Sequence, residues 1–178
     1  MHEIPRSQPS TIEAGQIWLI EQKATTGLYP LDRGAVTGAN VVLYDRALAP
    51  LVAAVLPIGS YAEPLPLNAQ EAISPRALAF AADGWSVVQL TEPCAGRRAQ
   101  LQGAAQALIP LAGAGDLPVQ VIAKAADARG RRRDGCLPRL AELIGELGDE
   151  GPLTLVFGPL AIRSPAHSHA FTANGLAG

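Results

Sequence analysis

The chain has 178 residues, enough for one domain or for two small lobes that share an interface. Hydrophobic residues make up 48% of it and charged residues 17%, which excludes an intrinsically disordered protein and allows a sizeable core. The formal net charge of −2 gives no general attraction to phosphate backbones, so no nucleic-acid partner is expected.

The first third of the chain alternates short apolar runs with segments rich in glycine and proline. Residues 16–20 (QIWLI) and 40–44 (NVVLY) have the composition of buried strands. Residues 21–34 between them contain glycines and a proline and predict a loop. Residues 48–56 predict a short helix, and residues 60–66 predict an extended, proline-rich connector.

The middle of the chain carries a clear helix start. Ser74 supplies a side-chain cap and Pro75 suits the first helical position, so a helix is expected to begin here. Gly84 ends it, because glycine adopts the left-handed conformation common after a helix. Residues 85–90 (WSVVQL) then predict a third strand, and residues 97–111 an alanine- and glutamine-rich helix.

The last third repeats the alternation of strand and helix. Residues 112–116 (AGAGD) predict a flexible joint, and residues 118–123 (PVQVIA) a fourth strand. Residues 129–133 predict a basic turn, residues 137–147 a helix and residues 153–157 (LTLVF) a last strand. Strands that alternate with helices predict an α/β fold with a largely parallel sheet.

The cysteines and the longest apolar runs indicate where in the cell the protein is expected. Two cysteines, Cys94 and Cys136, are too few for a disulfide framework and predict free thiols of a cytoplasmic protein. The N-terminal residues lack the basic start and apolar run of a signal peptide. The longest apolar stretch, residues 48–58, falls short of the ~20 residues that a membrane helix needs. No membrane association is therefore expected.

Four segments carry a resemblance to a known family. Residues 39–46 (ANVVLYDR) form a β-branched strand that ends in tyrosine, aspartate and arginine, with a short helix and a proline–glycine turn after it. Three further segments match in chain order, at residues 15–20, 73–90 and 118–160. Together they resemble the tetrapyrrole methylases, the uroporphyrinogen-III C-methyltransferases in particular. The resemblance covers most of residues 15–162, with an interruption near residues 95–117.

The resemblance implies a tetrapyrrole-methylase-like α/β fold. An N-terminal lobe would hold a mostly parallel sheet, and a reduced C-terminal lobe would also be α/β. The implied divisions are a flexible lead-in, the N-terminal lobe, the C-terminal lobe and a mobile tail, at residues 1–14, 15–95, 96–162 and 163–178. Members of the family commonly form homodimers, so a homodimer is expected here too.

The resemblance also implies an activity and a set of site residues. It predicts S-adenosylmethionine as cofactor and transfer of its methyl group to a ring carbon of a tetrapyrrole such as uroporphyrinogen III, as in sirohaem and cobalamin synthesis. Asp45 would be catalytic, and Tyr44 and Arg46 would bind the substrate. The positions expected at the cofactor are Glu92, Pro93, Gly96, Arg97 and Gly158. This chemistry requires no metal.

Three departures from the family pattern support a second hypothesis. Residues 21–30 lack the paired glycines of the family's tetrapyrrole-lining loop, and glycine permits the closest backbone approach to a ligand. Residues 90–93 (LTEP) are two residues shorter than the family's glycine–aspartate–proline turn, with Glu92 in place of the aspartate. Residues 98–117 are too short for the family's middle section. The alternative is therefore a non-catalytic descendant that binds a small molecule or a protein.

An open cleft at the strand ends near residues 20, 45 and 91 would favour the enzyme. Filling of that cleft by side chains such as Tyr29 or Leu31 would favour the alternative.

Several residues have two interpretations. Asp45 either faces a ligand in a cleft or serves the structure, as an ion-pair partner of Arg46 or as a cap for the helix near Leu48. Arg129 and residues 131–133 either clamp carboxylate or phosphate groups or form a solvated turn, which is the commoner role of such a run.

The tail contains two histidines, His167 and His169. They lie two residues apart without a nearby carboxylate or cysteine, so no metal site is expected there.

Overall fold

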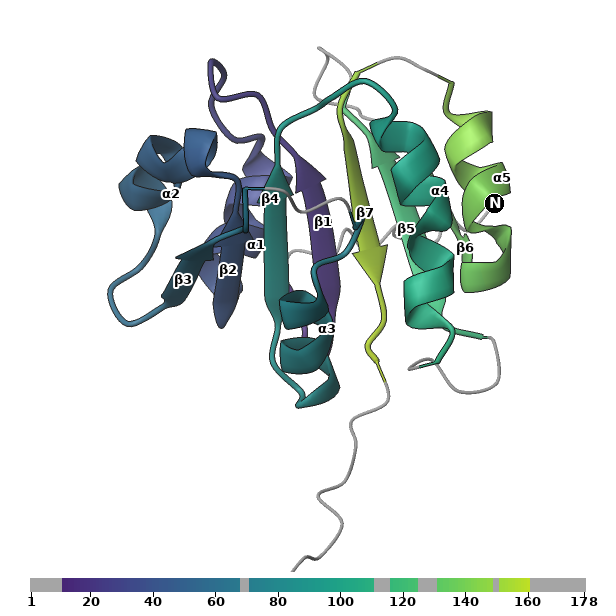
Figure 1. Cartoon of the computed structure of the whole chain (residues 1–178), viewed down its shortest axis with the longest axis horizontal. Coiled ribbons are helices and arrows are strands. Elements are labelled where there is room, and N and C mark those ends of the chain that lie inside the picture. Colours follow the sequence, from purple (N-terminus) through teal and green to yellow (C-terminus); the bar gives the residue numbers. More distant parts are fainter. Residues whose placement is uncertain (1–10, 68–70, 111–115, 125–130, 149–150, 161–178) are drawn as a thin grey trace, which may run out of the picture.

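A computed structural model of the chain describes residues 11–67, 71–110, 116–124, 131–148 and 151–160. Seven strands of these parts form a single sheet with helices on both faces (Figure 1). The strands are β1 (Ile17–Glu21), β2 (Val41–Tyr44), β3 (Tyr61–Pro64), β4 (Val87–Thr91), β5 (Pro118–Ala123), β6 (Arg131–Cys136) and β7 (Leu153–Phe157). The α-helices are α1 (Pro30–Gly38), α2 (Ala49–Val55), α3 (Pro75–Ala82), α4 (Arg97–Leu108) and α5 (Leu140–Glu146), and short 3₁₀ turns, η1 (Arg46–Leu48) and η2 (Leu137–Arg139), precede α2 and α5.

The strand order is β3-β2-β4-β1-β7-β5-β6. The first four strands in this order are parallel to one another, which confirms an α/β fold with a parallel N-terminal sheet. β7 runs antiparallel to both β1 and β5, and β6 runs antiparallel to β5. Strands on both sides of residue 95 thus meet in one sheet through β1 and β7, and the lobe boundary at residues 95–96 stays a prediction.

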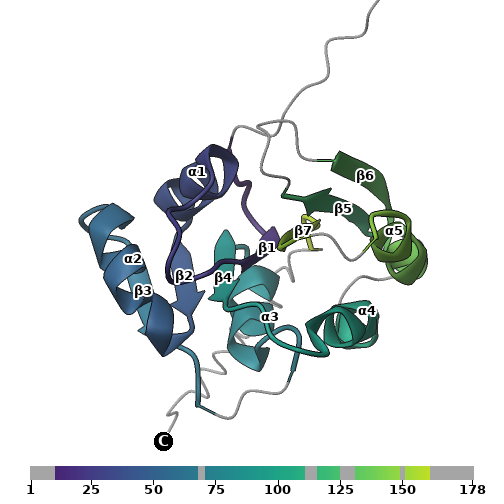
Figure 2. The ribbon, with the colours of Figure 1, turned by 90° about the horizontal axis from the view of Figure 1, so that it is seen from above.

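The apolar core lies in two layers, one on each face of the sheet. Successive side chains of a strand point to opposite faces, so Ile17 and Leu19 enter one layer while Trp18 and Ile20 enter the other. Helices α3, α4 and α5 cover the first layer, and α1 and α2 cover the second. Figure 2 shows α1 on one side of the sheet and α3 and α4 on the other.

Three expected elements differ from the structure. Helix α1 occupies the second half of the predicted loop, because Pro30 at its first position favours a helix start despite the glycines that follow. The predicted connector at residues 60–66 contains strand β3. The predicted basic turn belongs in part to strand β6, an edge strand whose exposed side chains need not be apolar. The remaining strands and helices lie where they were expected.

Some expectations concern residues outside the described ranges. These are residues 1–10 of the lead-in, residues 112–115 of the joint, Arg129 and the tail with His167 and His169. Within the described ranges, no helix is long and apolar enough to cross a membrane.

Candidate functional site

The carboxyl ends of β1, β2 and β4 lie at one edge of the sheet, which we call the carboxyl edge. β4 lies between β2 and β1, and Tyr44 is level with Leu90 while Glu21 is level with Thr91. The segments that follow β2 and β4 are therefore neighbours, although they are far apart in the sequence. Ligands of open α/β sheets bind outside this edge. The structure thus places residues 44–46 beside the start of the segment that follows β4, as the sequence analysis expected of these strand ends.

Asp45 joins the ends of β2 and β4. Its backbone N–H donates to Leu90 O at 2.9 Å, and its carboxylate Oδ2 accepts from the backbone N–H of Glu92 at 2.8 Å. The side chain does not cap the 3₁₀ turn that follows, and no ion pair with Arg46 forms among the described residues. Asp45 therefore has a structural bond, but a different one from the two that its sequence position suggested.

Glu92 reaches from the end of β4 towards the loop after β1. Its Oε1 accepts from the backbone N–H of Ala24 at 3.3 Å, a long and exposed hydrogen bond. Its Oε2 makes no hydrogen bond with the described residues, and the side chain is half-buried. One oxygen of this carboxylate thus steadies the neighbouring loop and the other is available to a ligand.

The residues predicted to bind substrate, Tyr44 and Arg46, also have polar groups that could bind a ligand. Arg46 is exposed, and its guanidinium has no ion-pair partner in the described parts of the chain. The ring of Tyr44 packs against the apolar layer under α1 and α2, while no described residue bonds to its hydroxyl. A cation, a phenol and two partly engaged carboxylates therefore lie along the carboxyl edge.

The loop over the end of β1 is held by one buried glutamine. Gln22 is 1% exposed, and its Nε2 donates to the carbonyl oxygens of Lys23 and Thr26 and to the Thr26 hydroxyl, each at 2.9 Å. A longer bond reaches Gly27 O at 3.3 Å. This side chain fixes a closed loop where the resembled family would have paired glycines.

The apolar side chains of this segment fill the space beneath α1. Leu28 and Leu31 pack against the second apolar layer, and Tyr29 is half-buried with its ring 5.3 Å from Lys124 Nζ. Leu28 and Leu31 thus contribute to the packing of α1 against the sheet.

The turn between β4 and α4 contains Gly96 and Arg97. Gly96 has φ +79°, a left-handed conformation that favours glycine, and an added Cβ would meet no atom within 4 Å. Arg97 is 7% exposed, and its Nη2 donates to the Thr91 hydroxyl at 2.9 Å. Its Nε finds no hydrogen-bond partner among the described residues. Arg97 therefore ties the start of α4 to the end of β4 from beneath the turn.

Gly158 lies apart from the other predicted cofactor positions. Since β7 is antiparallel to β1, Phe157 is level with Ile17 and Gly158 falls at the opposite edge of the sheet. There its N–H donates to Pro118 O at 3.0 Å, and an added Cβ would meet Leu160 N at 2.7 Å. The structure does not bring Gly158 together with Glu92 or Asp45.

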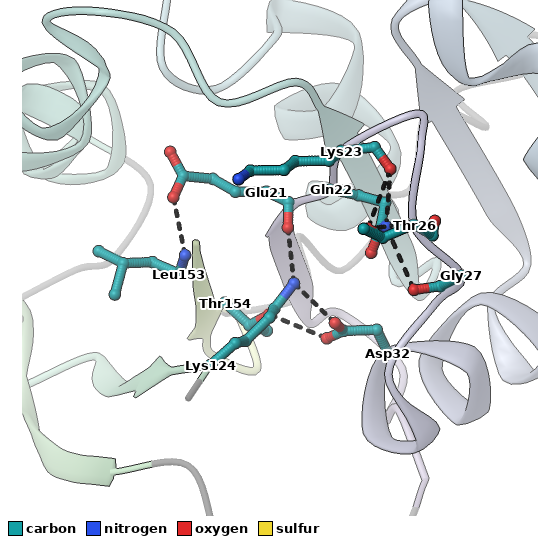
Figure 3. Close-up of polar contacts among 9 residues, drawn as sticks. All are labelled: Glu21, Gln22, Lys23, Thr26, Gly27, Asp32, Lys124, Leu153 and Thr154. Carbon is teal, nitrogen blue, oxygen red and sulfur yellow. Dashed lines mark hydrogen bonds and ion pairs between the residues drawn. The ribbon is translucent and has the colours of Figure 1, made fainter. Parts of the chain in front are cut away.

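A buried ionic cluster, which the sequence did not predict, lies beside the carboxyl edge (Figure 3). Lys124 follows β5, and its Nζ lies 2.6 Å from Asp32 Oδ2 of α1 in a buried ion pair. The same Nζ donates to Glu21 O at 2.6 Å. Asp32 Oδ1 accepts from the Thr154 hydroxyl at 2.8 Å. The cluster joins β1, β5, β7 and α1 at one point.

Burial dominates the electrostatics of this cluster. It lowers the pKa of Lys124, and the nearby charges of Asp32 and Glu21 oppose that shift without cancelling it. Glu21 is 5% exposed, and its carboxylate Oε2 accepts from the backbone N–H of Leu153 at 2.7 Å. These charged groups are bonded to residues of the chain itself, so we assign the cluster a structural role at the carboxyl edge.

The arginines of β6 are also largely paired. Arg132 lies 2.9 Å from Asp134, and Arg133 lies 3.1 Å from Glu146 of α5. Arg131 Nη2 donates to Leu147 O at 3.1 Å. These contacts favour a solvated, mutually neutralised strand over an anion clamp. Within the described residues, no three histidine, cysteine or acidic side chains are grouped as metal ligands.

Comparisons with known proteins give likenesses to solved structures but no match by sequence. No protein-family model and no curated protein matches the chain. One similar structure is cobalt precorrin-4 methyltransferase, a cobalamin biosynthetic enzyme, at 11% identity over 80% of this chain and 94% of that one, with a TM-score of 0.34. Another is uroporphyrin-III C-methyltransferase from Thermus thermophilus, at 18% identity over 80% and 91%, with a TM-score of 0.33. Superpositions this loose do not assign the chain to a family.

Proposed function

We propose that the carboxyl edge binds S-adenosylmethionine and that the chain is a methyltransferase-like protein acting on a tetrapyrrole of the uroporphyrinogen-III type. One observation carries this proposal. Tyr44, Asp45 and Arg46, which the sequence resemblance assigns to substrate binding and catalysis, lie beside Glu92, which it assigns to the cofactor, at the edge where α/β sheets bind ligands.

The polar groups at this edge suit such a cofactor. S-adenosylmethionine has a sulfonium and an ammonium cation and a ribose diol, all of which carboxylates bind well. Glu92 Oε2 is unengaged among the described residues, and the space beside Gly96 is open. Glu92, Pro93 and the backbone of Gly96 would hold the cofactor, with Arg97 supporting the turn from beneath.

The substrate side would be formed by Tyr44, Asp45 and Arg46. A tetrapyrrole of this type has carboxylate side chains, and the exposed guanidinium of Arg46 can bind a carboxylate through two parallel hydrogen bonds. When bound, S-adenosylmethionine supplies an electrophilic methyl group. The residues of the chain would contribute by orienting a pyrrole carbon, so most of the rate gain would come from positioning.

A second candidate, a non-catalytic binding module, is favoured by one specific observation. Asp45 Oδ2 and Glu92 Oε1 both accept from backbone N–H groups of the chain itself. The carboxyl edge is therefore partly self-satisfied. A protein that binds the cofactor but transfers no methyl group would agree both with the predicted site residues at this edge and with the hydrogen bonds that occupy their carboxylates.

Calorimetric titration of the full chain with S-adenosylmethionine and S-adenosylhomocysteine tests the cofactor site. We expect micromolar affinity, and about a tenfold loss in Glu92→Gln because a charged acceptor is removed. Glu142→Gln, on the exposed face of α5, is the matched control and should bind like the wild type. Absence of binding at millimolar ligand would overturn the proposed function.

A methyl-transfer assay with uroporphyrinogen III then separates the two candidates. Turnover would establish the enzyme. Cofactor binding without turnover would establish the binding module.

A further inference from the structure

Residues 22–29 form a loop that connects the carboxyl end of β1 to α1, beside the proposed cofactor site. The loop is closed on itself, because the buried amide of Gln22 donates to three of its backbone carbonyl groups. Its own contact with the site is weak. One hydrogen bond joins residues 23–28 to the other described parts of the chain, the exposed 3.3 Å contact of the Ala24 N–H with Glu92. This bond alone would not fix the position of the loop.

Lys124, from another part of the sheet, contacts both ends of this loop (Figure 3). Its Nζ donates to Glu21 O at 2.6 Å, directly before the loop. The same nitrogen lies 2.6 Å from Asp32 Oδ2, in the first turn of α1 just after the loop. The ring of Tyr29, the last loop residue, lies 5.3 Å from Nζ, within the range of a cation–π contact. A single ammonium group therefore holds the two points between which the loop is closed.

Strand β7 fixes both acceptors of Lys124 from a second direction. The Glu21 carboxylate accepts from the backbone N–H of Leu153 at 2.7 Å. The next residue, Thr154, donates its hydroxyl to Asp32 Oδ1 at 2.8 Å. The ammonium group thus meets two acceptors whose positions are already set, and it holds the loop ends at one separation.

Stability of the fold does not by itself require a lysine at this position. Well-packed apolar residues often stabilise a protein as much as a buried ion pair of similar volume, because buried charges lose their hydration. An ammonium group differs in what it fixes, since its N–H groups bind a carbonyl oxygen and a carboxylate in defined directions. Lys124 therefore contributes to the position of the loop in a way that an apolar side chain could not.

We propose that Lys124 is a positioning residue for the carboxyl edge, which holds both ends of loop 22–29 and so keeps Ala24 against Glu92 beside the bound cofactor. The role at the cofactor rests on the proposed function, whereas the hold on the loop is a property of the free protein. A binding-competent position that is populated only part of the time lowers the apparent affinity by that fraction. Loss of Lys124 would therefore weaken cofactor binding without removing a group that touches the cofactor.

Hydrogen exchange of the full chain without ligand measures the hold on the loop. The test variant is Lys124→Met/Asp32→Asn, which breaks the contact and leaves no buried charge without a counterion. We expect exchange in residues 22–29 to be at least about tenfold faster than in the wild type, because the loop ends are released. Residues 17–20 of β1 are the internal reference and should not show this acceleration.

Gln89→Met is the matched control. Gln89 is 2% exposed and lies level with Leu19 on the opposite face of the sheet, where its side chain binds Ser74 N and Ala72 O. This variant also loses buried hydrogen bonds, but exchange in residues 22–29 should match the wild type. Wild-type exchange of the loop in a folded double variant would overturn the proposal, and so would equal acceleration in Gln89→Met.

Calorimetric titration of the same proteins with S-adenosylhomocysteine connects the loop to the site. We expect the wild type and Gln89→Met to bind alike and the double variant to bind about tenfold more weakly. Equal affinity of the double variant would overturn the role at the cofactor. Absence of binding by the wild type would contradict the proposed function and with it that role, while hydrogen exchange separately decides whether Lys124 holds the loop.

Discussion

Asp45 shows how a single residue at the carboxyl edge serves the structure. Its Oδ2 holds the backbone N–H of Glu92 at 2.8 Å, and the two segments of the proposed site meet through this bond. We expect Asp45→Ala to lower the free energy of unfolding by about 1 kcal/mol, because the half-buried N–H loses its acceptor. Asp45→Asn keeps an acceptor and should cost less. Urea unfolding measures both, and equal costs would contradict this role.

Lys124 is the residue on which the buried cluster depends. Removing its charge in Lys124→Met leaves the carboxylate of Asp32, which is 1% exposed, without a counterion. We expect this to lower the free energy of unfolding by about 3–5 kcal/mol. Lys124→Met/Asp32→Asn removes the stranded charge and should be more stable than the single variant. Chemical denaturation tests this, and a less stable double variant would be contrary to the expectation.

The lowered pKa of Lys124 also predicts a pH dependence. The folded state holds this proton less tightly than the unfolded state, whose pKa is near 10.5. Between the folded pKa and 10.5 the unfolded state therefore binds more protons, and stability from this group rises with pH. Wild type should gain stability relative to Lys124→Met as pH increases through this window. Parallel stability profiles of the two proteins would contradict the burial effect.

Substitutions at Gly96 and Gly158 allow the cost of backbone strain to be distinguished from the cost of a steric clash. Gly96 and Gly158 both have positive φ, but an added Cβ has open space at Gly96 and meets Leu160 N at 2.7 Å at Gly158. We expect Gly96→Ala to cost about 1–2 kcal/mol from strain alone. Gly158→Ala should cost about 2–5 kcal/mol, because backbone must also shift. Thermal unfolding measures both, and the reverse ranking would contradict the turn geometry.

The elements divide into those that local sequence determines and those that it does not. Strands such as β4 were predictable because a short apolar run rich in β-branched residues, preceded by a glycine, is typical of a buried strand. Helix α3 was predictable because Ser74 does cap it, accepting from the Arg76 N–H at 3.2 Å. Strand β6 was not, since an edge strand with both faces partly exposed lacks an apolar pattern. Helix α1 was missed because Gly27, Pro30 and Gly34 are residues typical of a loop, although Pro30 also suits a helix start.

The candidate site divides in the same way. Tyr44, Asp45 and Glu92 could be found because polar residues follow apolar strands, and parallel strand ends share an edge. The position of Gly158 depends on the antiparallel direction of β7, which no local pattern reports. The ion pair of Asp32 with Lys124 joins distant segments, so only the folded chain reveals it.

At the scale of the whole molecule, the pairing of β1 with β7 predicts that the chain unfolds as one unit. β1 has β4 on one side and β7 on the other, and its side chains enter both apolar layers. A fragment of residues 1–95 would lose β7 and expose a central strand as an edge. We expect that fragment to show no cooperative unfolding, and the full chain to unfold in one transition. Calorimetry tests both, and a cooperatively folded fragment would support separate lobes.

The central claim is that the carboxyl edge of β1, β2 and β4 is a cofactor site. Hydrogen exchange of the full chain with and without saturating S-adenosylhomocysteine tests it most directly, because it reports both binding and its location. We predict slower exchange in residues 22–29 and 91–98, and no change at the opposite edge in residues 12–16 and 157–160. Protection confined to the opposite edge, or no protection at millimolar ligand, would contradict the claim.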